Sequence, residues 1–469
     1  MKYIGSYFRM NSLSKDNIKS QLFFLSKEAL KTILLNSRCG IECDKKANLT
    51  NDINIQNKIY PLTCIYRKSS PSLINTKSST IFDQSTIKKE ITPLSNALMT
   101  LCTLELSTYY KFYEDNDRKN SSHKNLYISL CKNQLDFYYN NLRNDEGLFI
   151  SKKNSIDANV SSYSLINSKD KFKFSDQAFM MISYYLYSMT NSNDKECNEY
   201  KNFALEIFSM FIEYKEELYS MSFDESVTVL FCFNLMYKYS STEQCKNIIL
   251  DLCDLCIDKF NSKNYYSSSL DYTGLLAICL RDCYKITEID SFMEISNSIM
   301  QEFKKMYDEK NHIFIKPPKD NSKKDKKEIK YSCTEIALYF LTILILDDDN
   351  ETNFFSKNAI SNMYKKMIID SSLICSFPEA PTLDEIERYR KLSLLSEDML
   401  EEISFRMPRC NSPKLTSLAP VFIKSITYNR KKDTFSVKHK IFDSDKNLLI
   451  FFLVIHYLKD NVISQMNFT

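Results

Sequence analysis

The chain has 469 residues and a net charge of only +3, from 62 basic and 59 acidic side chains. With its charges so evenly balanced, the chain has no excess of positive charge with which to bind nucleic acid. Only four glycines are present, too few for the glycine-rich loops that hold nucleotide phosphates, so we expect no cofactor of that kind.

Cysteine usage and the first residues indicate a reducing compartment. The fifteen cysteines are odd in number and scattered, which does not suit a disulfide framework. Lys2 and Arg9 interrupt any apolar signal segment. The longest apolar runs, Ile336–Leu346 and Leu448–Leu458, have about eleven residues, too few to span a bilayer. We therefore expect a cytoplasmic protein without a membrane segment.

The N-terminal part predicts one long helix followed by irregular chain. The helix covers Lys15–Leu35, and Gly40 shortly after it is typical of a helix end. Residues 36–90 are polar and mixed, with a possible strand at Tyr60–Lys68. Thr92 then precedes a proline, a favourable cap and first turn for the apolar helix that follows.

Two kinds of helix alternate in the middle of the chain. Asn202–Glu213 and Asn247–Asp258 each carry one narrow polar stripe, at i, i+4, i+7 and i+11. Other segments, such as "QAFMMISYYLY", "ESVTVLFCFNLMY", "YTGLLAICL" and "EIALYFLTILIL", are apolar all round. Such helices must be surrounded by protein, whereas striped helices cover them from outside. The period of about 46 residues is typical of two-helix repeats.

The C-terminal part has a different pattern. "VFIKSITYNRKKDTFSVKHKIF" alternates on both sides of Asn429–Asp433, which predicts a β-hairpin, and Leu448–Leu458 is expected to be buried as a strand or helix. The charged insertion Lys316–Lys330 predicts a solvated loop, since no aromatics interleave its lysines for nucleic-acid binding. We divide the chain into an N-terminal helix plus irregular segment (1–90), helical hairpins (91–405) and a C-terminal element (406–469).

The number of helical hairpins favours a closed ring over an open solenoid. Five hairpins are predicted at about 94–142, 175–219, 223–260, 270–308 and 333–370. The N-terminal helix and Leu394–Phe405 are candidates for the sixth pair. Twelve helices in two layers, with loops such as "NDEGLFI" and "YDEKNHIFI", resemble the (α/α)6 toroid of the six-hairpin glycosidases and sugar epimerases. The resemblance covers roughly residues 90–405, is one of architecture, and implies an all-α double ring.

Acids precede or open the all-round apolar helices, and we take Asp176, Asp224, Asp271 and Glu335 as candidate catalytic residues. The structural explanation is that a first-turn acid caps the helix and complements its dipole. In a toroid, however, the N-termini of the inner helices open at one end, where these acids would converge. Two carboxylates, one protonated and one ionised, can break a glycosidic bond, and one carboxylate can move a proton beside a carbonyl.

Tyrosines are the candidates for sugar stacking because the chain has no tryptophan. We take Tyr185, Tyr266 and Tyr272 as candidate substrate-binding residues. Aromatic side chains at helical spacing are also ordinary core residues, so packing is the alternative explanation for each of them.

No metal site is predicted. Cys253-x-x-Cys256 and Cys279-x-x-x-Cys283 have usable spacings, but both pairs lie in apolar helical segments, where cysteine acts as a small hydrophobe. The four histidines do not form a helical pair.

Two functions remain open on the sequence. The resemblance implies carbohydrate binding or processing, hydrolase-like or epimerase-like. The alternative is a non-catalytic helical-repeat scaffold that binds a protein or peptide, which the lack of tryptophan, the rarity of glycine and the sufficiency of capping favour. A deep pocket lined by carboxylates with raised pKa values would indicate the enzyme, and a shallow apolar surface the scaffold.

Overall fold

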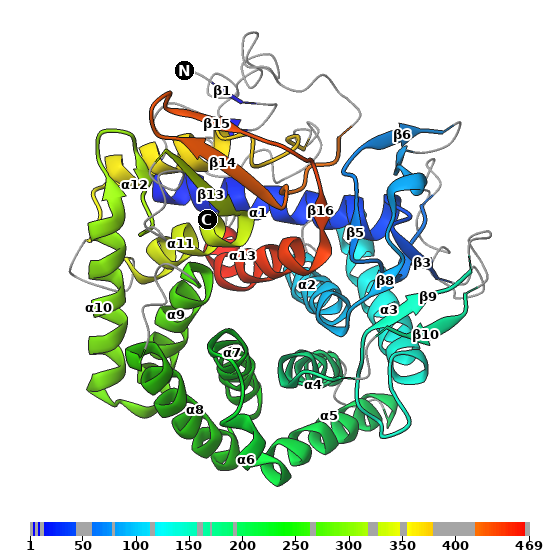
Figure 1. The fold of residues 1–469 in the computed structure, drawn as a ribbon. Helices are drawn as coiled ribbons and strands as arrows, with labels where there is room; N and C mark the ends of the chain where they lie inside the picture. The colour runs from blue at the N-terminus through cyan, green and yellow to red at the C-terminus, as the bar shows by residue number, and fades with distance from the viewer. Residues whose placement is uncertain are drawn as a thin grey trace.

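The computed structural model describes residues 3–4, 8–9, 14–43, 59–76, 80–112, 118–156, 163–168, 171–190, 195–262, 269–317, 327–347, 354–378 and 418–464. In these ranges the chain forms two concentric layers of helices, seen nearly end-on in Figure 1. The predicted all-α double ring is confirmed.

The inner layer is a closed ring. It consists of α2 (Pro93–Lys111), α4 (Phe174–Ser188), α7 (Phe223–Ser240), α9 (Leu270–Thr287), α11 (Cys333–Leu346) and α13 (Ser444–Ser464). Each helix packs on the next, and α13 packs on α2 to complete the circle. The continuous burial of Cys333–Leu344 shows why these segments are apolar on every face. Protein surrounds each of them, so no face is left for water.

The outer layer covers the ring with striped helices. Its members are α1 (Lys15–Lys31), α3 (Arg118–Asn141), α5 (Lys195–Glu213), α8 (Glu243–Ser262), α10 (Asp290–Met306) and α12 (Lys357–Met363). Thr32–Asn36 and Tyr364–Ile369 continue α1 and α12 as π-helical turns, and α6 (Lys215–Leu218) is a single turn between α5 and α7. In α8 the predicted stripe residues Asn247, Asp254 and Asp258 are exposed, as expected for an outer helix.

The sixth helix pair differs from the prediction. Its inner helix is α13, from the segment that the sequence set apart as a C-terminal element, and it packs on α1, α2 and α11. Leu394–Phe405 lies outside the described residues. Helices from all three predicted segments, 1–90, 91–405 and 406–469, therefore contribute to the ring.

Helix α13 also has the length and composition of a membrane span, which the eleven-residue estimate from the sequence did not indicate. Its most apolar window is 67% buried inside the protein. The neighbouring helices of the ring account for that apolar surface, as in the core helix of a soluble protein.

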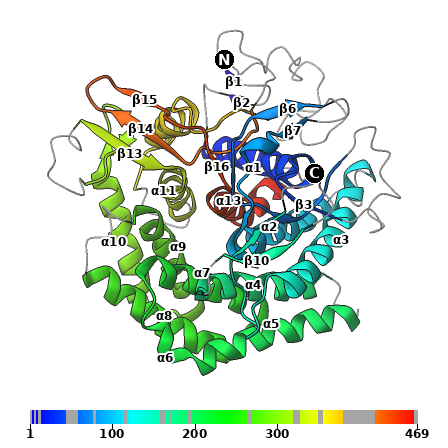
Figure 2. The same cartoon turned by 45° about the vertical axis from the view of Figure 1, so that its right-hand side comes forward.

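Short antiparallel strands occupy the connections. The pairs are β1 (Tyr3–Ile4) with β2 (Phe8–Arg9), β3 (Gly40–Glu42) with β4 (Leu62–Ile65), β5 (Lys68–Ser69) with β16 (Phe442–Asp443), β6 (Leu73–Asn75) with β7 (Thr80–Phe82), and β11 (Tyr307–Asp308) with β12 (Ile313–Phe314). Two three-stranded sheets are β8 (Glu90–Ile91), β9 (Lys152–Asn154) and β10 (Leu165–Asn167), and β13 (Glu328–Ser332), β14 (Ser425–Asn429) and β15 (Thr434–Ser436). From β3 onward, every strand lies in a connection that leads into an inner helix. Figure 2 shows many of them together around α1, α11 and α13.

The hairpin expected around Asn429–Asp433 is present as β14 and β15. Gly40, however, does not end the N-terminal helix as expected. Arg38 takes the left-handed conformation there (φ 53°), and Gly40 lies in β3. A Cβ atom at Gly40 would come within 1.9 Å of the Cys64 carbonyl oxygen, so close strand packing explains this glycine.

Candidate functional site at the N-terminal mouth of the ring

First-turn residues of neighbouring inner helices contact one another at one end of the ring, which we call the N-terminal mouth. The contacts are Thr92 (α2) with Asp445 (α13), Lys446 (α13) with Thr334 (α11), Thr334 with Asp271 (α9), and the Ser175 N–H (α4) with Glu225 (α7). Asp445 of α13 also acts electrostatically on Asp176 of α4, which joins the two groups of contacts. The N-termini of all six inner helices therefore lie at one end of the ring.

Asp176 is the most perturbed carboxyl group of the mouth. Its residue is only 7% exposed, and it makes no hydrogen bond or ion pair with any described residue. Burial, together with the negative charges of Asp445 and Glu225, raises its pKa to about 7, against the opposing effects of Lys173 and Arg67. A carboxyl group with this pKa can donate or accept a proton near neutral pH.

Asp176 is not the cap of its own helix. The N-cap position of α4, Lys173, makes no side-chain capping bond. Instead, Glu225 of the neighbouring helix accepts a hydrogen bond from the Ser175 N–H at 3.4 Å. Capping therefore does not account for Asp176, although its place in the first turn of α4 still complements the helix dipole.

Asp271 belongs to α9, two helices further around the ring from α4, and has more partners. Its carboxylate accepts hydrogen bonds from the Thr334 hydroxyl (2.6 Å) and from the Tyr272 N–H (3.2 Å). Burial raises its pKa, Thr334 opposes this, and the charges of Glu335 and Asp224 raise it further. Asp224 and Glu335 are therefore within electrostatic reach of Asp271.

Glu335 is the candidate that capping does explain. Ser332 and Glu335 form a reciprocal capping box, in which each side chain accepts the other residue's backbone N–H, at 2.7 and 3.1 Å. The second carboxylate oxygen pairs with Lys316 at 2.7 Å. In Glu335 both oxygens are thus engaged in structural contacts.

The three candidate tyrosines have different positions. Tyr272 lies at the mouth, where burial and the charges of Asp271, Asp224 and Asp445 raise its pKa. Tyr185 follows Asp176 by nine residues, about 13 Å along the helix, and is buried near Cys245 instead. Tyr266 lies outside the described residues.

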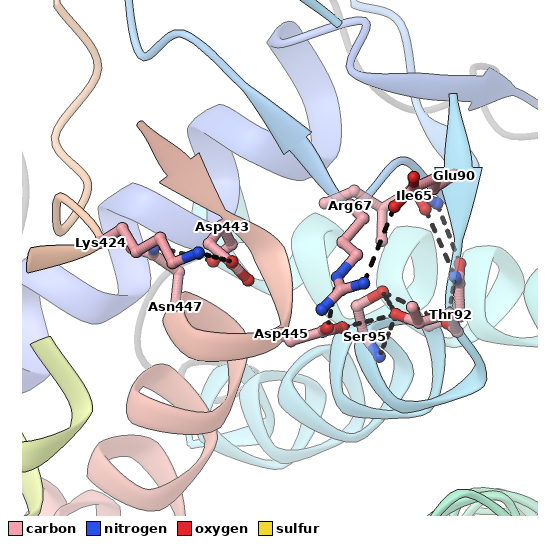
Figure 3. A network of polar contacts seen from close by, with 10 residues as sticks. Ile65, Arg67, Glu90, Thr92, Ser95, Lys424, Asp443, Asp445 and Asn447 are labelled. Carbon is pink, nitrogen blue, oxygen red and sulfur yellow. Dashed lines mark hydrogen bonds and ion pairs between the residues drawn. The ribbon is translucent and has the colours of Figure 1, made fainter. Parts of the chain in front are cut away.

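Asp445 was missed by sequence reasoning. Its carboxylate accepts a hydrogen bond from the Thr92 hydroxyl and pairs with Arg67 at 3.0 Å, as Figure 3 shows. Burial raises its pKa, and Thr92 and Arg67 oppose the rise. The signal was available, because "SD" precedes "KNLLIFFLVIHYL" as it precedes "QAFMMISYYLY". It was overlooked because that apolar run was not assigned to the ring.

Within the described ranges, no group of three or more His, Cys, Asp or Glu has the arrangement of a metal site. Cys253 and Cys283 lie 3.2 Å apart, sulfur to sulfur, between α8 and α9. Both are completely buried, and burial raises the pKa of Cys283. These thiols serve as packing groups between the two layers.

No family model matches the chain, and no curated protein sequence matches it. A solved cellobiose 2-epimerase from Spirochaeta thermophila shares the architecture, with a TM-score of 0.50, 10% identity, and coverage of 94% of this chain and 98% of that chain. The chain thus has the (α/α)6 fold of a toroid protein.

Two further solved structures resemble it less closely. A cellobiose 2-epimerase from Bacillus thermoamylovorans has a TM-score of 0.47 at 11% identity, with 74% of this chain and 87% of that chain covered. An endoglucanase from the termite Nasutitermes takasagoensis has a TM-score of 0.47 at 10% identity, with 96% and 100% covered. Because both TM-scores are below 0.5, these two structures add no support for the fold beyond that of the Spirochaeta thermophila epimerase.

Proposed function

We propose that the protein binds and processes a carbohydrate at the N-terminal mouth, by acid–base chemistry in which Asp176 carries the proton. One observation supports this above all. A buried carboxyl group, with no hydrogen-bond partner among the described residues and a pKa raised to about 7, lies among other carboxylates at the mouth of a closed ring. Structural carboxylates are normally paired when buried, so this one is suited to a ligand.

Two reactions suit this arrangement. In a hydrolase-like reaction, protonated Asp176 donates to the leaving oxygen while an ionised carboxylate of the mouth acts as base or nucleophile. In an epimerase-like reaction, the Asp176 carboxylate takes a proton from the carbon beside a carbonyl. The fold supports a sugar substrate only in general terms, because one fold hosts many functions. The weight of the proposal is therefore on Asp176.

The scaffold alternative has less support. A solenoid binds partners on the concave face of an open array, but the described inner helices close into a ring.

The cysteines in the described part of the chain are all free thiols. They support a reducing compartment, and we extend the proposal to the cytoplasm.

Binding can be tested by thermal shift with a panel of mono- and disaccharides that includes cellobiose. We expect at least one sugar to raise the melting temperature of the wild type and to do so less in Asp176→Asn. Asp254→Asn, on the exposed stripe of α8, is the matched control and should behave as wild type. A panel in which no sugar shifts the melting temperature would favour the scaffold.

A further inference from the structure

Acid–base chemistry by Asp176 needs a second, ionised carboxylate. The carboxylates that act electrostatically on Asp176 are the candidates for it. The two carboxylates that raise its pKa are Asp445 and Glu225. Glu225 is engaged by the first turn of α4, because it accepts the Ser175 N–H. Asp445 comes from α13, and its contacts come from Thr92 and Arg67 and not from α4. Of the two carboxylates, it is the one that does not also serve the first turn of α4.

Asp445 is held by two groups from other elements. One oxygen accepts a hydrogen bond from the Thr92 hydroxyl, and the other lies 3.0 Å from Nε of Arg67. A donated hydrogen bond and a nearby positive charge both favour the ionised form of a carboxylate. Asp176 makes no hydrogen bond or ion pair with a described residue, and the charges of Lys173 and Arg67 only partly oppose the rise of its pKa. The two acids therefore differ in the way that a proton donor and an ionised base require.

Arg67 lies where the N-termini of α2 and α13 meet. Its N–H donates to the Glu90 carbonyl in β8 at 2.8 Å, and its carbonyl accepts the N–H of Ser444, the first residue of α13, at 2.9 Å. On one side β4 pairs with β3, and on the other β5 pairs with β16. The backbone at Arg67 is therefore fixed before its side chain makes any contact.

The side chain of Arg67 reaches two acids, and Figure 3 shows both. Its Nη1 lies 3.7 Å from Glu90, whose side chain is 43% exposed, whereas the Asp445 side chain is 17% exposed. A shorter, less exposed ion pair is less screened by water. The contact with Asp445 is therefore the stronger of the two. Two more charges act on Asp445. Asp443, which pairs with Lys424, opposes its ionisation, and Lys173 favours it.

We propose that Asp445 is the ionised partner of Asp176 and that Arg67 is the positioning residue that holds Asp445 in this role. The inference rests on the proposed function, since a substrate must lie between the two acids. In the hydrolase-like case, Asp176 gives its proton to the leaving oxygen as the C–O bond breaks. Asp445 takes a proton from the attacking water, whose oxygen bonds to the sugar carbon. Exchange with solvent then restores both acids.

Infrared titration of the full-length protein tests the assignment without a ligand. The C=O band of a protonated aspartic acid that titrates near pH 7 should disappear in Asp176→Asn. In Arg67→Gln a second such band, that of Asp445, should titrate at higher pH than in the wild type, because loss of an adjacent positive charge moves a carboxyl midpoint up by about 1–3 pH units. Adding Asp445→Asn to this variant should remove that band. Arg67→Lys, which keeps the charge, should restore the wild-type spectrum in large part.

Glu90→Gln is the matched control, since it removes the other partner of Arg67 and should leave both midpoints unchanged. If the Arg67→Gln spectrum equals that of the wild type from pH 5 to 9 while the protein remains folded, the inference is wrong. If Arg67→Gln does not fold, the same comparison is made with Arg67→Lys and Thr92→Val. Loss of the Thr92 bond should also move the Asp445 midpoint upward, and an unchanged midpoint would contradict the assignment.

A sugar that shifts the wild-type melting temperature separates this inference from the proposed function. If the sugar is processed, Asp445→Asn should lower the rate about 10²- to 10⁴-fold, the usual contribution of a positioned acid or base. Arg67→Gln should move the pH optimum upward, which a purely structural arginine would not do. Processing that survives in Asp445→Asn would overturn the inference and leave the proposed function intact. A shifted Asp445 midpoint without any sugar binding would instead overturn the proposed function.

Discussion

The strongest stability prediction concerns a buried carboxylate far from the mouth. Glu105 lies twelve residues beyond the start of α2, about 18 Å along the helix, and its side chain is 3% exposed. It accepts contacts from His456 Nδ1 and Lys459 Nζ, each at 2.6 Å, and from the Tyr239 hydroxyl at 3.3 Å. These groups join α2, α7 and α13, so the carboxylate links three inner helices.

We predict that Glu105→Gln lowers the free energy of unfolding by about 3–5 kcal/mol. Breaking one partner of a buried ion pair leaves the other charge uncompensated, and this range is typical of that loss. The Lys459 side chain is only 12% exposed, so water compensates little for the missing carboxylate. Urea unfolding at pH 7 measures the change. Glu206→Gln, on the exposed face of α5, is the control and should change stability by less than about 0.5 kcal/mol.

The same residue predicts a pH dependence. Burial alone would raise the pKa of Glu105, but His456 and Lys459 outweigh it and hold that pKa far below its usual range. A depressed folded pKa contributes stability that is fully present above the unfolded value of about 4.3 and is lost as the pH falls toward the folded value. The wild type should therefore lose stability below about pH 4 more steeply than Glu105→Gln does. A variant as stable as the wild type at pH 7, or with the same acid slope, would show that the Glu105 ion pair does not stabilise the fold.

Three further predictions test the packing. Gly40→Ala should lower the free energy of unfolding in urea by about 3 kcal/mol or more, because the added Cβ would meet the Cys64 carbonyl oxygen. An unchanged free energy of unfolding would contradict the β3–β4 packing. Thr334→Val should cost about 1.5–3 kcal/mol, the value of a hydrogen bond to a charged group, and should raise the Asp271 midpoint in an infrared titration; an unchanged midpoint would exclude the Thr334 contact. Among the described cysteines, Cys43 alone is not buried. Cys43→Ser should therefore remove one equivalent of the thiol that reacts rapidly with a labelling reagent. An unchanged amount of rapidly labelled thiol would show that Cys43 is inaccessible.

Local pattern was sufficient for most of the ring. An apolar run with no polar face, such as Cys333–Leu344, requires protein on every side, and a single polar stripe such as that of α8 requires solvent on one side. These two rules predicted five inner helices and their partners. Leu448–Leu458 was left as a strand or helix because periodicity does not separate the two in a short apolar run. Only the closed ring shows that this run is part of the sixth inner helix.

The roles of the acids were less accessible from sequence. Asp176 and Glu335 both lie at the third helical position, yet one is unpaired among the described residues and the other forms a capping box. The difference comes from Ser332 and Lys316 near Glu335, and local spacing identifies only the first of these. Arg67 was beyond prediction for the same reason, since its contact with Asp445 joins distant parts of the chain.

The central claim is that Asp176 carries the proton for chemistry on a sugar. The most direct test is product analysis after incubating the wild type, Asp176→Asn and Asp254→Asn with disaccharides at neutral pH. We expect conversion of at least one sugar by the wild type and by Asp254→Asn, with a loss of about 10²- to 10⁴-fold in Asp176→Asn. Equal conversion by all three proteins, or conversion by none, would contradict it.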